Sequence, residues 1–170
     1  MKMRARRDAA IVDMDGTLAD VSTIRHLVDG VKTKKDFNAF HRASEFVPAN
    51  RQAIDFCARH HKAGHDILVV TARMEMWRGA TTRFLERELV PHVPYAGLWH
   101  RADGDYRKDR EIKTEIFEDL SQRYNIVAAC DDNPAIIELW EEKAIPEIEI
   151  IPGWDYDAAK RYAEMANRHI

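Results

Sequence analysis

The chain has 170 residues and a mass of 19.7 kDa, which is the size of one ordinary domain. Its 45% of hydrophobic residues supplies a core, and its 32% of charged residues and net charge of −3 suit a soluble protein. No apolar run approaches the length of a membrane span, and the basic segment 1–7 is not followed by the apolar core of a signal peptide.

Strand-like apolar runs alternate along the chain with segments of helical period. This alternation predicts an α/β fold, in which a parallel sheet carries helices on both faces. The expected strands are 8–13, 66–71, 95–100, 126–131 and 148–151. The expected helices are 51–63, 75–89, 109–124, 134–144 and 155–168.

The segment 18–50 interrupts this alternation directly after the first strand. It contains helical patterns of its own over 21–28 and 35–43, and Pro48 ends it. Because structureless loops of this length are rare, we expect a small helical cap inserted into a single domain that spans 1–170. A cap at this place would cover the end of the first strand and exclude water from it.

The first expected strand ends in two carboxylates, Asp13 and Asp15, followed by Gly16 and Thr17. Open α/β sheets bind their ligands at the carboxyl ends of strands, and two acids on alternate residues repel unless a cation or a shared proton offsets them. The pattern favours a metal-assisted reaction in which one carboxylate attacks and the other moves a proton. The alternative is a strand-to-loop turn, where Asp, Gly and Thr are common.

The second expected strand ends in Thr71-Ala72-Arg73, at the predicted entry to a helix. A hydroxyl group and free backbone N–H groups at a helix N-terminus would bind a phosphate group. An ordinary helix N-cap is the alternative interpretation, because Thr is a good capping residue.

The fourth expected strand is followed by Asp131 and Asp132, with Pro134 at the first position of the next helix. A capping pair is one interpretation. If the sheet is parallel, however, these acids lie at the same edge as Asp13 and Asp15, and an all-oxygen cluster indicates Mg²⁺ rather than zinc.

Such a cluster needs a positive side chain as well as a metal. Lys113, next to an apolar residue near a helix start, is the candidate that can reach inward, and Lys108 is its competitor. A solvated charged loop is the alternative interpretation of 107–110, and we expect it for Lys108 and Arg110. The 8 histidines show no pattern of a site, and we expect His60 and His61 at the surface.

Two cysteines, Cys57 and Cys130, lie far apart and lack the spacing of metal ligands. They predict free, buried thiols in a reducing compartment, so we expect a cytoplasmic protein. Trp77, Trp99 and Trp140 are expected in or near the core.

The four elements in this order, Asp-x-Asp-Gly-Thr, Thr-Ala-Arg, a lysine and Asp-Asp, resemble the haloacid dehalogenase (HAD) superfamily of Rossmann-like folds. The resemblance implies phosphoryl transfer in which Asp13 is the nucleophile, Asp15 is first a general acid and then a base, and Lys113 stabilises the charge. It implies phosphate binding at Thr71, Ala72 and Arg73. It also implies a Mg²⁺ ion held by Asp13, the Asp15 backbone carbonyl and the pair Asp131 and Asp132.

The last third of the chain is similar to the 3′-phosphatase domains of bacteriophage polynucleotide kinase-phosphatases. The matching residues are His100-Arg101, Asp105-x-Arg107-Lys108-Asp109, Ile112-Lys113-x-Glu115, Asp131-Asp132 and Leu139-Trp140. The similarity favours Lys113 over Lys108 and places Arg101 near the substrate. The sequence differs from that family in having Asn133 where an arginine follows the acidic pair, and it contains no phosphate-binding loop of a kinase.

We therefore expect a Mg²⁺-dependent phosphatase that acts through an aspartyl-phosphate, with phosphorylated nucleic acid ends or 3′-nucleotides as substrates. The alternatives are a 5′(3′)-deoxyribonucleotidase or another small-molecule phosphatase, and a non-catalytic binding protein on the same fold. A separate kinase or ligase is a conceivable partner, and no membrane association is expected.

Overall fold

The computed structural model describes residues 5–152 and Met165. Five parallel strands form one sheet in the order β3-β2-β1-β4-β5. Their bounds are Arg7–Val12 (β1), Asp66–Met74 (β2), Gly97–Arg101 (β3), Tyr124–Asp131 (β4) and Glu147–Ile150 (β5). The expected α/β, Rossmann-like parallel sheet is thereby confirmed.

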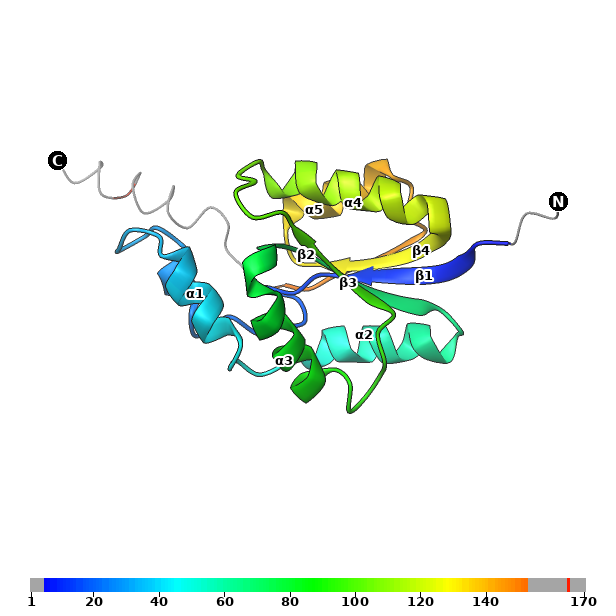
Figure 1. The fold of residues 1–170 in the computed structure, drawn as a ribbon, viewed down its shortest axis with the longest axis horizontal. Helices are drawn as coiled ribbons and strands as arrows, with labels where there is room; N and C mark the ends of the chain where they lie inside the picture. The colour runs from blue at the N-terminus through cyan, green and yellow to red at the C-terminus, as the bar shows by residue number, and fades with distance from the viewer. Residues whose placement is uncertain (1–4, 153–164, 166–170) are drawn as a thin grey trace.

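Helices cover both faces of this sheet (Figure 1). One face carries α4 (Asp109–Arg123) and α5 (Pro134–Glu142), and the other carries α2 (Arg51–Lys62) and α3 (Arg78–Glu88). The short 3₁₀ helix η2 (Glu75–Trp77) precedes α3. The helix expected over 155–168 lies outside the described residues, apart from Met165.

Strand β1 occupies the centre of the sheet, and its last four residues, 9–12, are buried. Side chains alternate between the faces of a strand, so Ala10 and Val12 pack in one core cluster while Ala9 and Ile11 pack in the other. A continuous apolar run is therefore required here, because both faces of a central parallel strand are covered.

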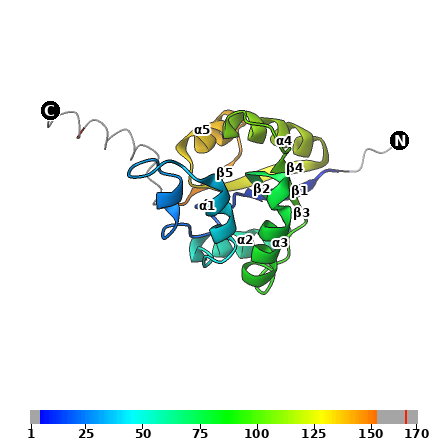
Figure 2. The ribbon, with the colours of Figure 1, turned by 60° about the vertical axis from the view of Figure 1, so that its left-hand side comes forward.

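The cap comprises a short 3₁₀ helix, η1 (Arg25–Leu27), and α1 (Phe37–Ser44). Figure 2 shows α1 in front of the sheet, beyond the carboxyl ends of the strands. The two connections to the cap lie side by side, because Asp20 N donates to Pro48 O at 2.9 Å and Asn50 N donates to Leu18 O at 2.8 Å. Segment 18–50 thus leaves and re-enters the sheet at one place.

The helix expected over 21–28 is wrong, because only the three residues of η1 are helical there. The side chain of Asp20 accepts a hydrogen bond from Ser22 N at 3.1 Å, which holds the backbone in a turn. The four residues 21–24 are all Val, Ser, Thr or Ile, and these have weak helix propensity. The apolar residues of this segment are nevertheless buried, because Val21 and Val28 pack in the core without forming a helix.

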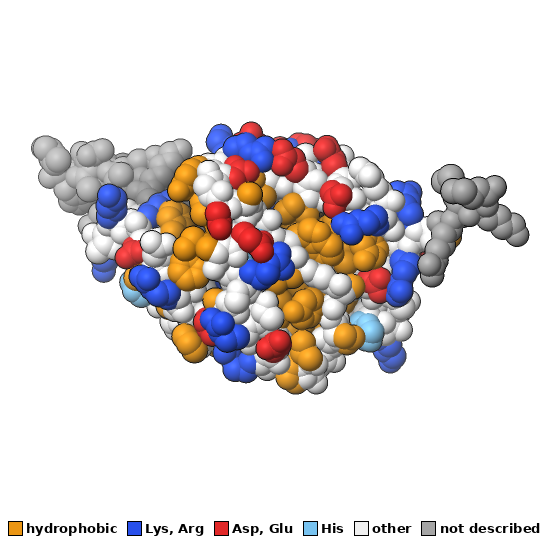
Figure 3. All heavy atoms as spheres, in the orientation of Figure 1, with side chains coloured by type: hydrophobic (Ala, Val, Ile, Leu, Met, Phe, Trp, Pro, Cys, Tyr) orange, Lys and Arg blue, Asp and Glu red, His pale blue; other side chains and the backbone are white. Residues whose placement is uncertain are grey.

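The outer surface of α4 and α5 carries charges of both signs, which Figure 3 shows interspersed along the top of the molecule. Arg110 pairs with Glu142, Arg123 with Asp119 and Lys143 with Glu118. This is the solvated face expected for Arg110. Among the described residues, no helix has both the length and the apolar character to cross a membrane.

Candidate active site

In the turn after β1, the backbone of Gly16 lies against the side chain of Asp132, which follows β4. Gly16 has a φ of +82°, and a Cβ atom built on it would lie 2.3 Å from Asp132 Oδ2. No other residue tolerates both this conformation and this contact. The glycine is therefore required for the carboxylates of the β1 and β4 ends to approach.

Lys113 joins the two strand ends. Its Nζ atom donates to Asp13 Oδ1 at 2.8 Å and to Asp131 Oδ2 at 2.7 Å. All three side chains are buried, and Lys113 comes from the second turn of α4. Lys108, the competing candidate, is exposed at the N-terminus of that helix. The structure thus brings Lys113, and not Lys108, to the predicted acids.

The electrostatics of this cluster follow from burial and from its excess of carboxylates. Burial raises the pKa of Asp13 well above its usual value; Lys113 opposes this, whereas Asp131 and Asp132 add to it. Burial alone would lower the pKa of Lys113, but Asp13 and Asp131 outweigh it and raise that pKa. One lysine does not compensate the negative charge of the cluster.

Oxygen atoms of Asp13, Asp131 and Asp132 all lie within 4.8 Å of one another. Thr17 Oγ1 lies 3.2 Å from Asp13 Oδ2 and 3.1 Å from Asp132 Oδ1, so its hydroxyl group can orient either. Buried carboxylates whose charge exceeds that of their cation are a donor set suited to Mg²⁺. The side chain of Asp15 is not part of this group, so its predicted contribution rests on its backbone carbonyl alone.

Asp15 turns instead toward Arg73, which arises from β2. Arg73 Nε donates to Asp15 Oδ2 at 2.9 Å, and Nη2 donates to the other oxygen. Arg73 is only 2% exposed, and it also donates to Ser44 in the cap and Thr81 in α3. Burial raises the pKa of Asp15, but the charge and hydrogen bonds of Arg73 outweigh this and lower it below its usual value.

The segment 71–73, expected after the second strand at the entry to a helix, belongs to the strand itself. Strand β2 continues to Met74, and its pairing with β3 shifts between Val70 and Met74, so the segment forms an irregularity in an extended strand. Thr71 is buried and its Oγ1 accepts a hydrogen bond from Arg73 N at 3.2 Å. Thr71 and Ala72 nevertheless line the cavity in front of the carboxylates.

Arg101 lies at the end of β3 and holds the following loop together. It donates to the carbonyl groups of Ala72, Asp105 (2.9 Å) and Arg107 (2.8 Å), and it pairs with Asp109. Its side chain lines the same cavity. Arg101 therefore lines the cavity with a guanidinium group that is already hydrogen-bonded to the loop.

One histidine reaches the site, although the sequence showed no sign of it. His41 in α1 places Nδ1 at 3.9 Å from Asp15 Oδ2, and its ring lies 5.4 Å from that of Trp77. Burial lowers the pKa of His41, although Asp15 opposes this. The spacing of histidines in the sequence could not predict the contact between His41 and Asp15, because that contact depends on how the cap packs against the strand ends.

The expected surface position of His60 is also wrong, whereas that of His61 agrees with the structure. His60 is buried between α2 and β5, with Nδ1 at 3.0 Å from His65 Nδ1 and Nε2 at 3.2 Å from Glu147. Trp140 is fully buried, and Trp77 and Trp99 are half-buried.

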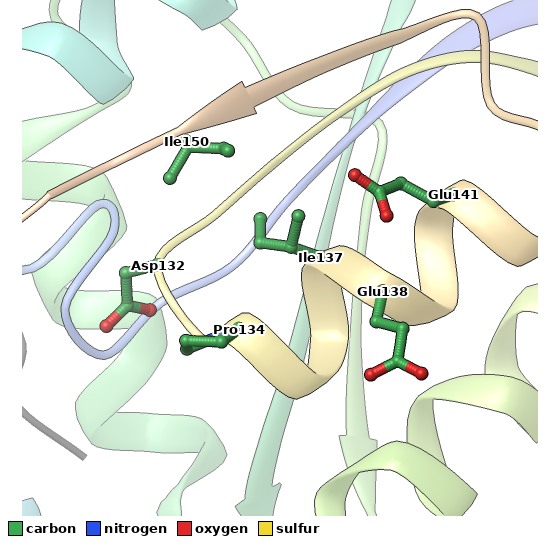
Figure 4. Close-up of a pocket in the computed structure, with 6 residues that line it drawn as sticks. All are labelled: Asp132, Pro134, Ile137, Glu138, Glu141 and Ile150. Atoms are coloured by element: carbon green, nitrogen blue, oxygen red, sulfur yellow. The ribbon is translucent and has the colours of Figure 1, made fainter. Parts of the chain in front are cut away.

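A cavity of about 810 Å³ opens in front of these groups, between the cap and the strand ends. Asp13, Asp15 and Lys113 line it from the sheet side, and α1 closes it from the cap side. A second, shallower hollow of about 380 Å³ lies between α5 and β5 (Figure 4). Of the acidic cluster only Asp132 borders it, whereas Asp13, Asp15 and Lys113 line the larger cavity.

Comparison with known proteins adds to this geometry. A family model described as the polynucleotide kinase PNKP phosphatase domain matches residues 7–153. A protein of Autographa californica nuclear polyhedrosis virus, provisionally described as a bifunctional polynucleotide kinase/RNA ligase, is 24% identical over 143 residues. That match covers 82% of this chain and 19% of the viral protein, so the chain spans about one-fifth of this relative.

Solved structures share the fold. A chain of the Pnkp1/Rnl/Hen1 complex matches with a TM-score of 0.71 and 23% identity, over 90% of this chain and 48% of that one. The class C acid phosphatase from Bacillus anthracis with tungstate bound matches with a TM-score of 0.67 and 20% identity, over 99% and 81% of the two chains. At these identities the likeness concerns the fold.

Proposed function

The chain belongs to the family of polynucleotide kinase PNKP phosphatase domains within the HAD phosphatases, and we propose that it removes 3′-phosphates from nucleic acid ends or 3′-nucleotides. The reaction would use Mg²⁺ and a covalent aspartyl-phosphate. The observation that carries the proposal is Asp13 itself, a buried carboxylate that Lys113 holds beside two further acids at the wall of a large cavity.

In the first step an Asp13 oxygen attacks phosphorus and forms an acyl-phosphate, while the bond from phosphorus to the nucleoside oxygen breaks. Asp15 gives a proton to the departing oxygen. Lys113, fixed by Asp131 at 2.7 Å, neutralises the charge that gathers on Asp13 and the phosphoryl group.

In the second step water attacks the phosphorus of the acyl-phosphate, and Asp15 accepts a proton from that water. The Asp13–phosphorus bond breaks, so that inorganic phosphate leaves and the Asp13 carboxylate is restored. The Arg73 guanidinium lowers the pKa of Asp15 and so favours its carboxylate form, which can accept a proton in this second step. In the first step Asp15 must carry a proton, and there the same shift works against it.

Asp13, Asp131 and Asp132 would hold Mg²⁺ together with the Asp15 backbone carbonyl, and the metal would supply positive charge for the transferring phosphoryl group. Thr71, Ala72 and Arg101 line the cavity in which the phosphate must lie. The backbone of the irregular segment 71–73 is the proposed phosphate contact, whereas Arg73 acts through Asp15. Arg101 would lie near the phosphate while its guanidinium group holds the loop through Asp105 and Arg107.

A kinase or ligase is the partner that this activity fits, because repair of a nucleic acid end joins a 3′-hydroxyl group to a 5′-phosphate. The viral relative is described with both activities, and the structural relative comes from a complex. The free, buried Cys57 and Cys130 support our proposal that the chain works in the cytoplasm.

The decisive experiment compares a 3′-phosphorylated oligonucleotide, 3′-dTMP and 5′-dTMP as substrates with Mg²⁺. We expect hydrolysis of the first two, whereas hydrolysis of 5′-dTMP alone would favour a nucleotidase. Asp13→Asn should abolish turnover without unfolding the protein, and Asp55→Asn on the exposed side of α2 serves as its control. A wild-type protein that hydrolyses no phosphomonoester with Mg²⁺ would favour a binding protein.

A further inference from the structure

The mouth of the large cavity carries an unusual concentration of exposed apolar side chains. Phe37 is 56% exposed, Met76 is 63% exposed and Tyr106 is 85% exposed, and all three line this cavity. They come from α1, from η2 and from the loop between β3 and α4. Exposed apolar side chains gathered at one opening indicate a ligand with an apolar surface.

Two of these segments are tied together by a run of rings. The ring of Phe37 lies 6.4 Å from that of His41, which in turn lies 5.4 Å from Trp77. Phe40 also meets His41, edge to face at 5.3 Å. The rings therefore form a continuous aromatic wall, defined as Phe37, His41 and Trp77, from the rim of the cavity inward.

The third segment is fixed to the same wall. Met76 N donates to Asp103 Oδ1 at 2.8 Å, so η2 is bonded to the loop that presents Tyr106. The aromatic wall also approaches Asp15, the proposed general acid, because His41 Nδ1 lies 3.9 Å from Asp15 Oδ2. The wall and Tyr106 thus border one path from solvent to Asp15.

This path leads to a particular part of the substrate. In the proposed reaction, on which this inference rests, Asp15 protonates the departing oxygen, so the leaving group lies on the side of Asp15. The aromatic wall reaches the same side of the cavity through His41. We propose that the aromatic wall and Tyr106 form a stacking subsite for the unpaired terminal nucleobases of a single-stranded 3′-phosphorylated end.

The chemistry of the wall suits base faces rather than base edges. Aromatic rings stack on any nucleobase because every base has a π-face, and such stacking is tolerant of sequence. Bases inside a duplex have both faces stacked on their neighbours, so a wall that contacts more than the outer face of the last base pair needs an unpaired strand end. Lys35 lines the same cavity and makes no ion pair with a described residue, which suits the phosphodiester that precedes the terminal nucleoside.

The test uses Phe37→Ala and Tyr106→Ala in the full chain, with Phe46→Ala as the matched control. Phe46 follows α1 and is 75% exposed, but it does not line the cavity. The substrates are a 3′-phosphorylated oligothymidylate and glycerol 2-phosphate, a secondary-alcohol phosphate without a base. Binding of the unphosphorylated oligothymidylate to Asp13→Asn gives a readout that does not depend on turnover.

For each cavity variant we expect kcat/KM on the oligonucleotide to fall about tenfold, mainly through KM. The oligonucleotide should also bind about tenfold more weakly when Phe37→Ala or Tyr106→Ala is added to Asp13→Asn. Activity on glycerol 2-phosphate should stay within about twofold, and Phe46→Ala should change neither substrate. Phe37→Tyr should restore oligonucleotide affinity, because it retains a ring.

Equal losses on both substrates, or unchanged oligonucleotide affinity, would overturn the stacking subsite while leaving the phosphatase intact. Failure of the proposed function has a different signature, in which the wild-type protein hydrolyses neither substrate. A fully paired 3′-phosphorylated blunt end that is processed as well as the single strand would also overturn the inference.

Discussion

Arg73 holds Asp15 from a position that is itself almost completely closed to water. The guanidinium donates to both oxygens of the Asp15 carboxylate and, through Nη2, to Ser44 Oγ in the cap at 2.9 Å. One side chain of β2 therefore couples the residue proposed to move protons to the helix that covers it.

The first prediction concerns the stability of this pair. Arg73→Met should lower the free energy of unfolding by about 3–5 kcal/mol, because it leaves the half-buried Asp15 charge without its buried partner. Arg51→Met removes the exposed pair with Asp55 and should cost less than about 1 kcal/mol. Urea unfolding of both variants measures the difference, and equal costs would contradict the importance of burial.

Lys113 and Lys108 provide a matched pair for the second prediction. Lys113→Met should lower kcat by at least about 100-fold, because it removes the cation that contacts Asp13 and Asp131. Lys108→Met at the exposed start of α4 should leave kcat within about twofold. Steady-state kinetics on a 3′-phosphorylated oligonucleotide decides the matter, and a larger loss for Lys108→Met would reverse the assignment.

Gly16 and Gly64 share a left-handed backbone but differ in surroundings. Each alanine variant should lose roughly 1 kcal/mol of stability through its backbone, because φ is +82° at Gly16 and +87° at Gly64, and Gly16→Ala should lose more because of its contact with Asp132. Only Gly16→Ala should lose activity as well, since its Cβ atom would displace Asp132, whereas Gly64 has no atom within 4 Å of such a Cβ. Thermal unfolding of both variants measures the backbone strain, and steady-state kinetics measures the effect of displacing Asp132.

The acidic cluster predicts stabilisation by magnesium. Mg²⁺ at 100 times its dissociation constant should stabilise the fold by about 2.7 kcal/mol relative to protein in chelator. Asp132→Asn should raise the stability of the metal-free protein, because it removes one of the carboxylates around Asp13, and should weaken the response to Mg²⁺. A melting temperature that is independent of Mg²⁺ in the wild type would refute a metal site.

A pH effect is expected at His60. Burial lowers the pKa of His60, although Glu147 opposes this, so the folded protein keeps the ring neutral where the unfolded chain takes up a proton. Stability should therefore decline as the pH falls below about 6.5, the ordinary value for histidine. His60→Gln should flatten this decline, and His61→Gln, at an exposed position, should not. Unfolding curves between about pH 7 and pH 5 provide the measurement.

The sequence by itself determined the sheet and the acids at its edge. Apolar runs bounded by turn residues located all five strands to within two residues at most ends, and the parallel topology then brought Asp13 and Asp131 to one edge of the sheet. This worked because a short continuous apolar run has few alternatives to a buried parallel strand. Gly16 marked the turn after the first strand because glycine adopts the positive φ that this turn needs.

Tertiary structure alone decided what faces Asp15. Arg73, Ser44 and His41 meet there because the cap packs over the strand ends, and no periodicity in 18–50 encodes the position of that docking. The extended course of 71–73 was equally hidden, since it depends on pairing with β3. Local patterns specify elements, whereas contacts between a cap and a sheet depend on how separate segments fill a shared volume.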